Sequence, residues 1–329
     1  MPKKAAELVG GIDIGGTKLH AVVADQQGRV LGRARKKSKA ERGFAPLMRR
    51  AAEVLGDACR TAGVKRPRLA AVGVGAPSPV LPDGTAVRAP NLGWENVPLV
   101  ETLARALKLP VHAANDCDAG TFGELVFGAA RGASTAIGLF MGTGLGGSIV
   151  IDGKLVTGAN HKAAELGHMV VVVGGRRCGC GNRGCLEAYA SKAGMLRRIR
   201  HHVLCEGHQT LLGELLDGDF SAIRSSVLAE AYGAEDPLTV ETLHEAADVL
   251  GAAVGSLLTM LGPEVVVLGG GVLEQLGRAL LPRIESAAAR STFPRSAFGD
   301  SELRLSRLGD DAVALGAVAL ALRRTGDGR

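Results

Sequence analysis

Two short glycine-rich stretches, each between segments with the alternating pattern of β-strands, constrain the fold of this chain most strongly. They are Asp13-Ile14-Gly15-Gly16-Thr17-Lys18 and, roughly 125 residues later, Gly142-Thr143-Gly144-Leu145-Gly146-Gly147. The second is no Walker A loop, because no Gly-Lys-Ser/Thr follows. It is no dinucleotide fingerprint either, because residues 148–151 read as a strand and not as a helix. Two strand–glycine–strand loops therefore indicate two halves built on one plan.

These loops suit a phosphate group. Glycine is about twice as frequent here as usual, with 47 in 329 residues, and it lets backbone N–H groups face an anion without interference from Cβ. In the first loop Thr17 adds a hydroxyl donor and Lys18 a positive charge. Asp13, at the strand end, could hold Mg²⁺ through water. The alternative for either loop is a plain hairpin turn.

A third glycine run, residues 269–271, follows a buried strand pattern and opens a helix. It is either a simple strand–helix turn or a place where Gly270 and Gly271 let the backbone approach a flat adenine ring or a ribose.

The order of the predicted elements indicates two α/β domains, because a strand meander followed by alternating strands and helices occurs twice. The expected strands are 8–14, 19–24, 30–35, 68–75, 109–114, 264–268 and 302–306, with a glycine-interrupted hairpin over 135–151. The expected helices are 44–59, 99–107, 119–130, 186–204, 239–261, 273–290 and 312–323.

A cluster of cysteine and histidine predicts a metal site. His168, Cys178, Cys180 and Cys185 match a tetrahedral Cys₃His zinc site of the structural kind. The alternative is a set of reduced cysteines beside an unrelated histidine. Glu165, His168 and Glu187 flank or belong to the cluster and would suit sugar hydroxyls, with solvated loop carboxylates as the alternative for the two glutamates.

Charge and hydropathy exclude other classes. The net charge of +6 is modest for this length and does not indicate a nucleic-acid partner. Residues 133–151 carry no charge, but five glycines interrupt them, so we expect a strand hairpin and no membrane span. No signal-peptide pattern opens the chain, and its cysteines do not spread like a disulfide framework, so we expect a cytoplasmic protein.

The motifs together resemble the ROK family of sugar kinases and repressors, within the actin-like, hexokinase-like ATPase superfamily, and most of all its glucokinase branch. The resemblance covers nearly the whole chain. It rests on DIGGTK at 13–18, PNLGW at 90–94, NDCDAG at 115–120, GTGLGG at 142–147, ELGH at 165–168, CGCGNRGCLE at 178–187, LGGGV at 268–272 and ALGAVALA at 314–321.

This resemblance implies an α/β fold of two ribonuclease H-like domains that flank a cleft. The expected domains are residues 1–117 with 311–329, and residues 118–310 with the zinc loop. Family members are commonly dimers or tetramers, so a homo-oligomer is expected as well.

The resemblance also implies roles for single residues. Asp116 is the catalytic base, and the sugar hydroxyls are held by Asn91, Asn115, Asp116, Glu165, His168 and Glu187. The nucleotide is held by Asp13, Gly15, Gly16, Thr17, Lys18, Thr143, Gly144, Gly270 and Gly271. The implied reaction is phosphorylation of glucose to glucose 6-phosphate with ATP and Mg²⁺, and the zinc ion is structural.

Some positions depart from the family pattern and bear on the choice of sugar. Ser78 stands where glycine is common, and His161, Lys162 and Ala164 stand where small residues or glycine are usual. Kinases for N-acetylhexosamines or fructose are therefore the alternatives. A sugar-sensing repressor is a further one, although only about seven residues precede the first strand, too few for a helix-turn-helix domain.

Overall fold

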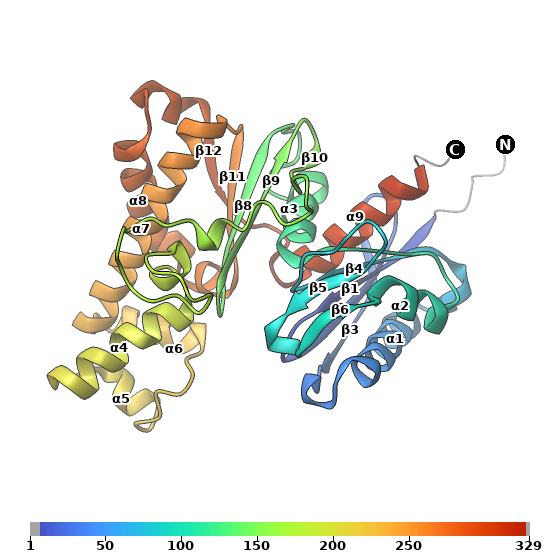
Figure 1. The fold of residues 1–329 in the computed structure, drawn as a ribbon, viewed down its shortest axis with the longest axis horizontal. Helices are drawn as coiled ribbons and strands as arrows, with labels where there is room; N and C mark the ends of the chain where they lie inside the picture. Colours follow the sequence, from blue (N-terminus) through green and yellow to red (C-terminus); the bar gives the residue numbers. More distant parts are fainter. Residues whose placement is uncertain (1–6, 327–329) are drawn as a thin grey trace. The chain divides into compact units, whose positions relative to one another are not determined.

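The computed structural model describes residues 7–326, which form two five-stranded sheets with packed helices (Figure 1). The first sheet has the strand order β3-β2-β1-β4-β7, and the second has the order β10-β9-β8-β11-β12. In each sheet, three strands that are consecutive in the chain lie on one side of the order, and two later, parallel strands lie on the other. The prediction of two α/β halves on one plan is confirmed at the level of strand order.

The elements have the following bounds. The first sheet contains β1 (Leu8–Ile14), β2 (Lys18–Ala24), β3 (Val30–Lys37), β4 (Leu69–Ala76) and β7 (Val111–Asn115), and the second contains β8 (Ala136–Met141), β9 (Leu145–Ile151), β10 (Lys154–Leu155), β11 (Val265–Gly269) and β12 (Glu302–Leu305). A small sheet joins β5 (Ala86–Ala89) and β6 (Trp94–Val97). The helices are α1 (Phe44–Thr61), α2 (Leu99–Leu107), α3 (Asp116–Phe127), α4 (Lys192–Glu206), α5 (Leu211–Leu215), α6 (Ser225–Gly233), α7 (Pro237–Leu261), α8 (Gly271–Ser291) and α9 (Ala312–Gly326).

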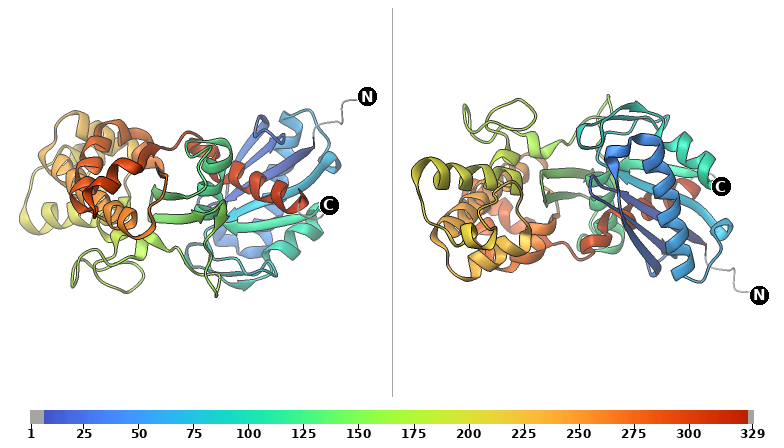
Figure 2. Two further views of the ribbon diagram at one scale, coloured as in Figure 1. Left: turned by 90° about the horizontal axis from the view of Figure 1, so that it is seen from above. Right: turned by 90° about the horizontal axis from the view of Figure 1, so that it is seen from below.

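Helices cover both faces of the first sheet, and the two views of Figure 2 show α1 and α9 on opposite faces. The apolar stripe of α1, which includes Leu47, Val54 and Leu55, is buried against Ile12 and Leu19. This is the face that the spacing of apolar residues in 44–59 predicts.

The last helix approaches the first sheet closely because glycine lines the contact. A Cβ atom on Gly11 of β1 would lie 2.0 Å from the carbonyl oxygen of Ala314 in α9, which no side chain can tolerate. A Cβ on Gly316 of α9 would likewise lie 1.6 Å from the carbonyl oxygen of Ala119 in α3. Part of the glycine excess therefore serves packing of α9 between the sheet and α3, a use that the sequence did not reveal.

The second sheet is built around β11, which is buried at every position and pairs in parallel with both β8 and β12. The helices α7 and α8 pack against each other, and α8 also contacts β11, β8 and β12 (Figure 1). The continuous apolar run of β11 is typical of a parallel strand covered on both faces.

The chain divides into two compact units that differ from the expected domains 1–117 with 311–329 and 118–310. One unit contains the described residues up to 134, together with 149–163 and those from 307 onward, and the other contains 135–148 and 164–306. The expected boundary between residues 117 and 118 lies inside α3. All of α3 belongs to the first unit because it packs along α9.

The expected secondary structure is wrong in several places, and the helices α5 and α6 were not expected. The single helix expected over 186–204 is interrupted, because a short 3₁₀ helix η5 (Leu186–Ala188) ends before Ser191, whose side chain caps the separate helix α4. The strands β5 and β6 were not expected at all, since their four-residue lengths are too short to show an alternating pattern. Within residues 7–326, no helix combines the length and the apolar character that crossing a bilayer would require.

Candidate functional site

Three neighbouring parallel strands of the first sheet end at one edge, and candidate residues lie at their ends. Asp13 of β1 lies opposite Gly75 of β4, and Ala76 of β4 lies opposite Asn115 of β7. Asp116 follows as the first residue of α3. Ligands of open α/β sheets bind outside the carboxyl ends of such strands, so this edge is the candidate catalytic centre of the first unit.

The cap of α3 places Asn115 and Asp116. The side-chain oxygen Oδ1 of Asn115 accepts hydrogen bonds from the backbone N–H groups of Cys117 at 2.8 Å and Asp118 at 3.3 Å. These bonds satisfy donors that the first turn of a helix leaves unpaired. Both residues are half-buried. The cap fixes the direction in which the chain leaves β7 and thereby the position of the Asp116 carboxyl group.

The carboxyl group of Asp13 has a raised pKa. Burial raises the pKa of its carboxyl group from 3.8 to about 7, and the negative charge of Asp116 adds to the rise, while Lys18 and His20 oppose it. A buried carboxyl group beside a second carboxylate is a favourable place for a divalent cation, whose positive charge would offset both negative charges. The chemistry of these donors thus fits the expectation that Asp13 holds Mg²⁺ through water.

The first glycine hairpin offers hydrogen-bond donors to solvent. Its turn closes by a bond from the N–H of Gly15 to the carbonyl oxygen of Lys18 at 2.9 Å. Gly16 and Thr17 are exposed, and no hydrogen bond within residues 7–326 uses their N–H groups. Asn91, in a short 3₁₀ helix over Pro90–Leu92, is exposed, and its Cβ would lie 3.9 Å from a Cβ placed on Gly16. The expected sugar residue Asn91 therefore lies beside the expected phosphate loop.

An acidic pair that the sequence analysis missed holds this hairpin. Asp310 and Asp311 precede α9, and Asp310 lies 3.1 Å from Nζ of Lys18 and 2.8 Å from a guanidinium nitrogen of Arg35. Asp311 lies 2.7 Å from Arg33. The only signal in the sequence is two acidic residues at the start of the last predicted helix, which is also typical of an ordinary helix N-terminus.

His20 lies at the centre of this network and is fully buried. Nε of Arg35 donates to Nδ1 of His20 at 3.2 Å, so the ring proton lies on Nε2, which donates to Asp311 at 2.7 Å. Burial opposes the ionisation of Asp311, but hydrogen bonds from His20 and Arg33 outweigh it and lower the pKa of Asp311 to about 2. The hairpin is thus held by charge-assisted hydrogen bonds.

The second glycine hairpin joins β8 to β9 and is held by backbone groups. The N–H of Gly142 donates to the carbonyl oxygen of Gly144 at 2.9 Å. The N–H groups of Lys192 and Ala193, in the first turn of α4, donate to the carbonyl oxygens of Gly142 and Thr143, each at 3.1 Å. The loop carbonyls therefore satisfy donors at the start of α4.

Glu187 joins this loop to the cysteine cluster. Its Oε2 accepts a hydrogen bond from the N–H of Leu145 at 3.1 Å, and its Oε1 accepts one from Sγ of Cys178 at 3.4 Å. A Cβ on Gly144 would lie 2.4 Å from Oε2 of Glu187, so glycine is what allows the carboxylate to lie against the loop. The residue expected at the sugar thus also contacts the expected phosphate loop.

The third glycine run lies next to the same loop. Gly270 has a φ of +87°, and its Cβ would lie 2.6 Å from the backbone oxygen of Met141, the residue that precedes Gly142. Gly271 begins α8, and its Cβ would approach only Oγ of Ser225, at 3.3 Å. Within the second unit, Thr143, Gly144, Gly270 and Gly271 therefore lie close together.

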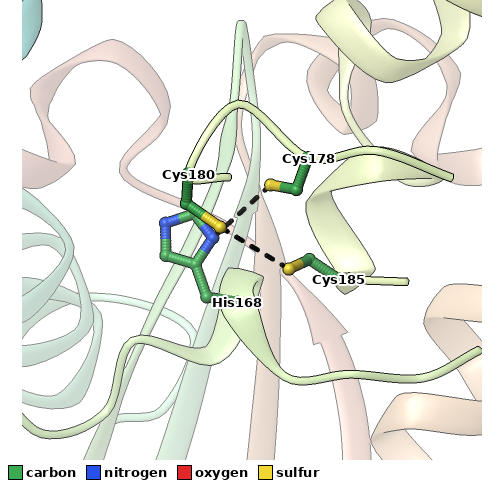
Figure 3. Close-up of side chains that lie close together, drawn as sticks. All are labelled: His168, Cys178, Cys180 and Cys185. Atoms are coloured by element: carbon green, nitrogen blue, oxygen red, sulfur yellow. Dashed lines mark hydrogen bonds between the residues drawn. The ribbon is translucent and has the colours of Figure 1, made fainter. Parts of the chain in front are cut away.

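The four residues of the predicted metal site converge, as Figure 3 shows. Nδ1 of His168 lies 3.8 Å from Sγ of Cys178, and Sγ of Cys180 lies 3.7 Å from Sγ of Cys185. All four ligand atoms lie within 4.8 Å of one another. Tetrahedral zinc with Zn–S bonds of about 2.3 Å separates neighbouring sulfur atoms by about 3.8 Å, so the donor set and its spacing fit a zinc ion.

Glu165 completes the second group of candidates, and residues 161–164 directly precede it. Partial burial of its carboxyl group raises the pKa of Glu165; His168 lowers it, and the charge of Glu187 adds to the rise. Positive φ values of 53° at His161 and 64° at Ala164 put these residues in the left-handed region that favours glycine. Both positions are among those that the resemblance marks as departures from the family pattern.

The structure thus brings the predicted residues together in two groups, one in each unit. The first group comprises Asp13, Gly15, Gly16, Thr17, Lys18, Asn91, Asn115 and Asp116. The second comprises Thr143, Gly144, Glu165, His168, Cys178, Cys180, Cys185, Glu187, Gly270 and Gly271.

Known proteins of similar sequence match most of the chain. It is 33% identical over 318 residues to a glucokinase of Thermotoga maritima, a match that covers 96% of this chain and 98% of the relative. It is also 33% identical over 274 residues to the N-acetylgalactosamine kinase AgaK of a Shewanella species, which covers 80% and 82% of the two chains.

The fold is similar to that of a solved ROK family glucokinase from Streptomyces griseus in complex with glucose and AMPPNP. That structure matches with a TM-score of 0.83 and 34% sequence identity, over 96% of this chain and 99% of the other. The expected hexokinase-like α/β fold class is confirmed by this likeness. The model of the ROK family matches residues 9–324, and with that match the chain belongs to the ROK family.

Proposed function

We propose that this chain is an ATP-dependent hexose kinase whose preferred substrate is glucose. The observation that carries the proposal is the carboxyl edge of β1, β4 and β7, where Asp13, Asn115 and Asp116 lie at the ends of adjacent strands. The glucokinases among its relatives support glucose as the sugar, and the relatives as a group support a hexose kinase.

Asp116 acts as the general base in this proposal. Its carboxylate takes the proton of the sugar hydroxyl while that oxygen forms a bond to the γ-phosphorus of ATP. The bond from the γ-phosphorus to its bridging oxygen breaks, and ADP leaves. Phosphoryl transfer consists mostly of positioning and charge stabilisation, so one base and a set of fixed donors are sufficient.

The two glycine hairpins supply those donors. The N–H groups of Gly16 and Thr17 and the charge of Lys18 serve the phosphates, and Thr143 and Gly144 contribute from the second unit. Asp13 would hold Mg²⁺ through water, and that ion would supply positive charge for the developing phosphate oxygens. Gly270 and Gly271 would face the adenosine.

Zinc belongs to the same proposal as a structural ion held by His168, Cys178, Cys180 and Cys185. By fixing the loop that carries His168 and precedes Glu187, it would orient two residues that bind sugar hydroxyls. Metal analysis of the purified chain should find about one zinc per chain. A chain that retains no zinc would remove this part of the proposal.

We also propose that the chain forms a dimer or a tetramer. Light scattering would measure the mass of this assembly.

The test of the catalytic role compares Asp116→Asn with Asp118→Asn, a substitution of the same kind in the same helical turn. ADP release should fall about 10²- to 10⁴-fold in the first variant and stay near that of the parent in the second. The fluorescence of Trp94, the only tryptophan and three residues from Asn91, would report whether sugar still binds. Retained turnover in Asp116→Asn would remove its assigned role.

The same assay run across sugars decides the substrate. Glucose should give the highest kcat/KM. If N-acetylhexosamines or fructose exceed it, the hexose kinase stands and the glucose assignment is wrong. The relative that phosphorylates N-acetylgalactosamine keeps that alternative open to this measurement.

A further inference from the structure

A second group of metal-ligating side chains lies away from the cysteines, at the last turn of α4. Three of the eight histidines of the chain fall within residues 201–208. One ligand atom each from His202, Glu206 and His208 lie within 4.8 Å of one another. The proposed kinase reaction uses none of them.

The backbone brings these side chains together. His202 and Glu206 are four residues apart, so they lie on one face of the helix. Gly207 ends α4 with a φ of +74°, and the N–H of His208 then donates to the carbonyl oxygen of His202 at 3.0 Å. This reversal of the chain returns His208 to the same face.

The side-chain geometry converges on the carboxylate of Glu206. Nδ1 of His202 lies 2.7 Å and Nε2 of His208 lies 3.5 Å from the same oxygen, Oε2. The two imidazole rings lie with their centroids 5.1 Å apart. Around one ion with bonds of about 2.1 Å, neighbouring ligand atoms are about 3.0–3.4 Å apart, so small side-chain rotations would place all three atoms around an ion.

We propose that His202, Glu206 and His208 form a surface site for a divalent transition-metal ion of the class that imidazole binds, such as Zn²⁺, Co²⁺ or Ni²⁺. Two imidazoles and one carboxylate are a donor set that such ions take up in proteins. The side chains are 21%, 41% and 49% exposed, so water completes the coordination. The ion would tie the last turn of α4 to the chain that follows it.

His201 and Cys205 are neighbours that should not take part. Nε2 of His201 lies 3.2 Å from the other oxygen of Glu206, Oε1, and its side chain is 63% exposed. Cys205 is exposed on the same helical turn. They provide matched controls, because each substitution changes a possible ligand within the same short segment.

The experiment titrates the full chain, preloaded with one equivalent of Zn²⁺ for the cysteine cluster, with Co²⁺ in a calorimeter and an absorption spectrometer. One Co²⁺ should bind without a thiolate-to-cobalt band. His202→Ala, His208→Ala and the isosteric Glu206→Gln should each weaken binding at least about tenfold, with His201→Ala and Cys205→Ser unchanged.

Three results would overturn the assignment. They are the absence of Co²⁺ binding outside the cysteines, an equal loss in His201→Ala, and a thiolate band that disappears in Cys205→Ser. Unchanged melting temperatures of the metal-free variants would show that each loss reflects a missing ligand and not misfolding. Failure of this site would leave the kinase proposal intact, because the test does not measure ADP release.

Discussion

The first hairpin, Gly15 to Lys18, and the second, Gly142 to Gly144, occupy corresponding places in two sheets of the same strand order, but different forces hold them. Charged side chains hold the first, through the pairs of Lys18 with Asp310 and of Arg33 with Asp311. Backbone N–H groups of α4 and the carboxylate of Glu187 hold the second. The same position in a fold can thus be fixed by ion pairs in one unit and by hydrogen bonds to a helix N-terminus and to one carboxylate in the other.

Disrupting the cysteine cluster should produce the largest difference between the two hairpins. Cys185→Ser is expected to release zinc and to lower kcat/KM about 10- to 100-fold, because Cys185 directly precedes the short helix that carries Glu187. Hydrogen exchange should quicken at residues 141–147 and stay unchanged at 8–24. Cys205→Ser is the control, and equal loss of protection in both hairpins would contradict the comparison.

A single methyl group should affect the second hairpin and spare the first. Gly144→Ala places a Cβ 2.4 Å from Oε2 of Glu187 and should break the bond from Leu145 to Glu187, while the control Gly56→Ala, in α1 of the first unit, meets nothing within 4 Å. The loss of that hydrogen bond should raise the KM for ATP up to about tenfold. Steady-state kinetics of the two variants measure the difference. Equal KM values would show that Glu187 does not position the loop.

Removing one charge should affect the first hairpin in a salt-dependent way. Asp310→Asn leaves Lys18 without its anionic partner, and both side chains are about half exposed. The KM for ATP should rise by no more than about fivefold at low salt, and less at high salt because ions screen exposed pairs. Glu214→Gln, on the short helix α5 of the second unit, should change nothing. A salt-independent effect would point to packing instead of charge.

The smallest expected effect concerns stability and pH. Because the pKa of Asp13 is about 7 in the folded chain and 3.8 is its ordinary value, the folded state holds this proton more tightly than the unfolded chain does. Ionising the carboxyl group of Asp13 therefore destabilises the folded state. This loss of stability is absent below about pH 4, grows as the pH rises toward 7 and is complete above it. Asp13→Asn should therefore melt a few degrees higher at pH 8, with no gain at pH 4 and with reduced activity. A gain that does not depend on pH would contradict the shift.

Whether the sequence could predict an interaction depends on how far apart its partners lie along the chain. The spacing of apolar residues predicts α1 and the bounds of α2, because a helix face is a local pattern. The cysteine spacing predicts a cluster that lies within one loop. The pair Asp310 and Asp311 was missed because its partners lie about 290 residues away, and nothing local distinguishes these residues from an ordinary helix start.

The contacts of Glu187 with the second hairpin escaped prediction for the same reason, since 42 residues separate it from Leu145. The motif that contains Glu187 indicates a functional carboxylate. It does not indicate that Oε2 of this carboxylate faces the second hairpin. The break between η5 and α4 also depends on tertiary structure, because the N–H groups freed at Lys192 and Ala193 find their acceptors in that hairpin.

The packing of α9 on the first sheet has a consequence for how the chain is made. The strands that this helix covers emerge from the ribosome early, whereas α9 is synthesised after all of the second unit. The second unit can therefore close while Val9, Val22 and Ala71 still lack their cover. During that interval the nascent chain exposes an apolar face of the first sheet. Chaperones would therefore have longer access to the first unit than to the second, although the first unit begins to be synthesised earlier.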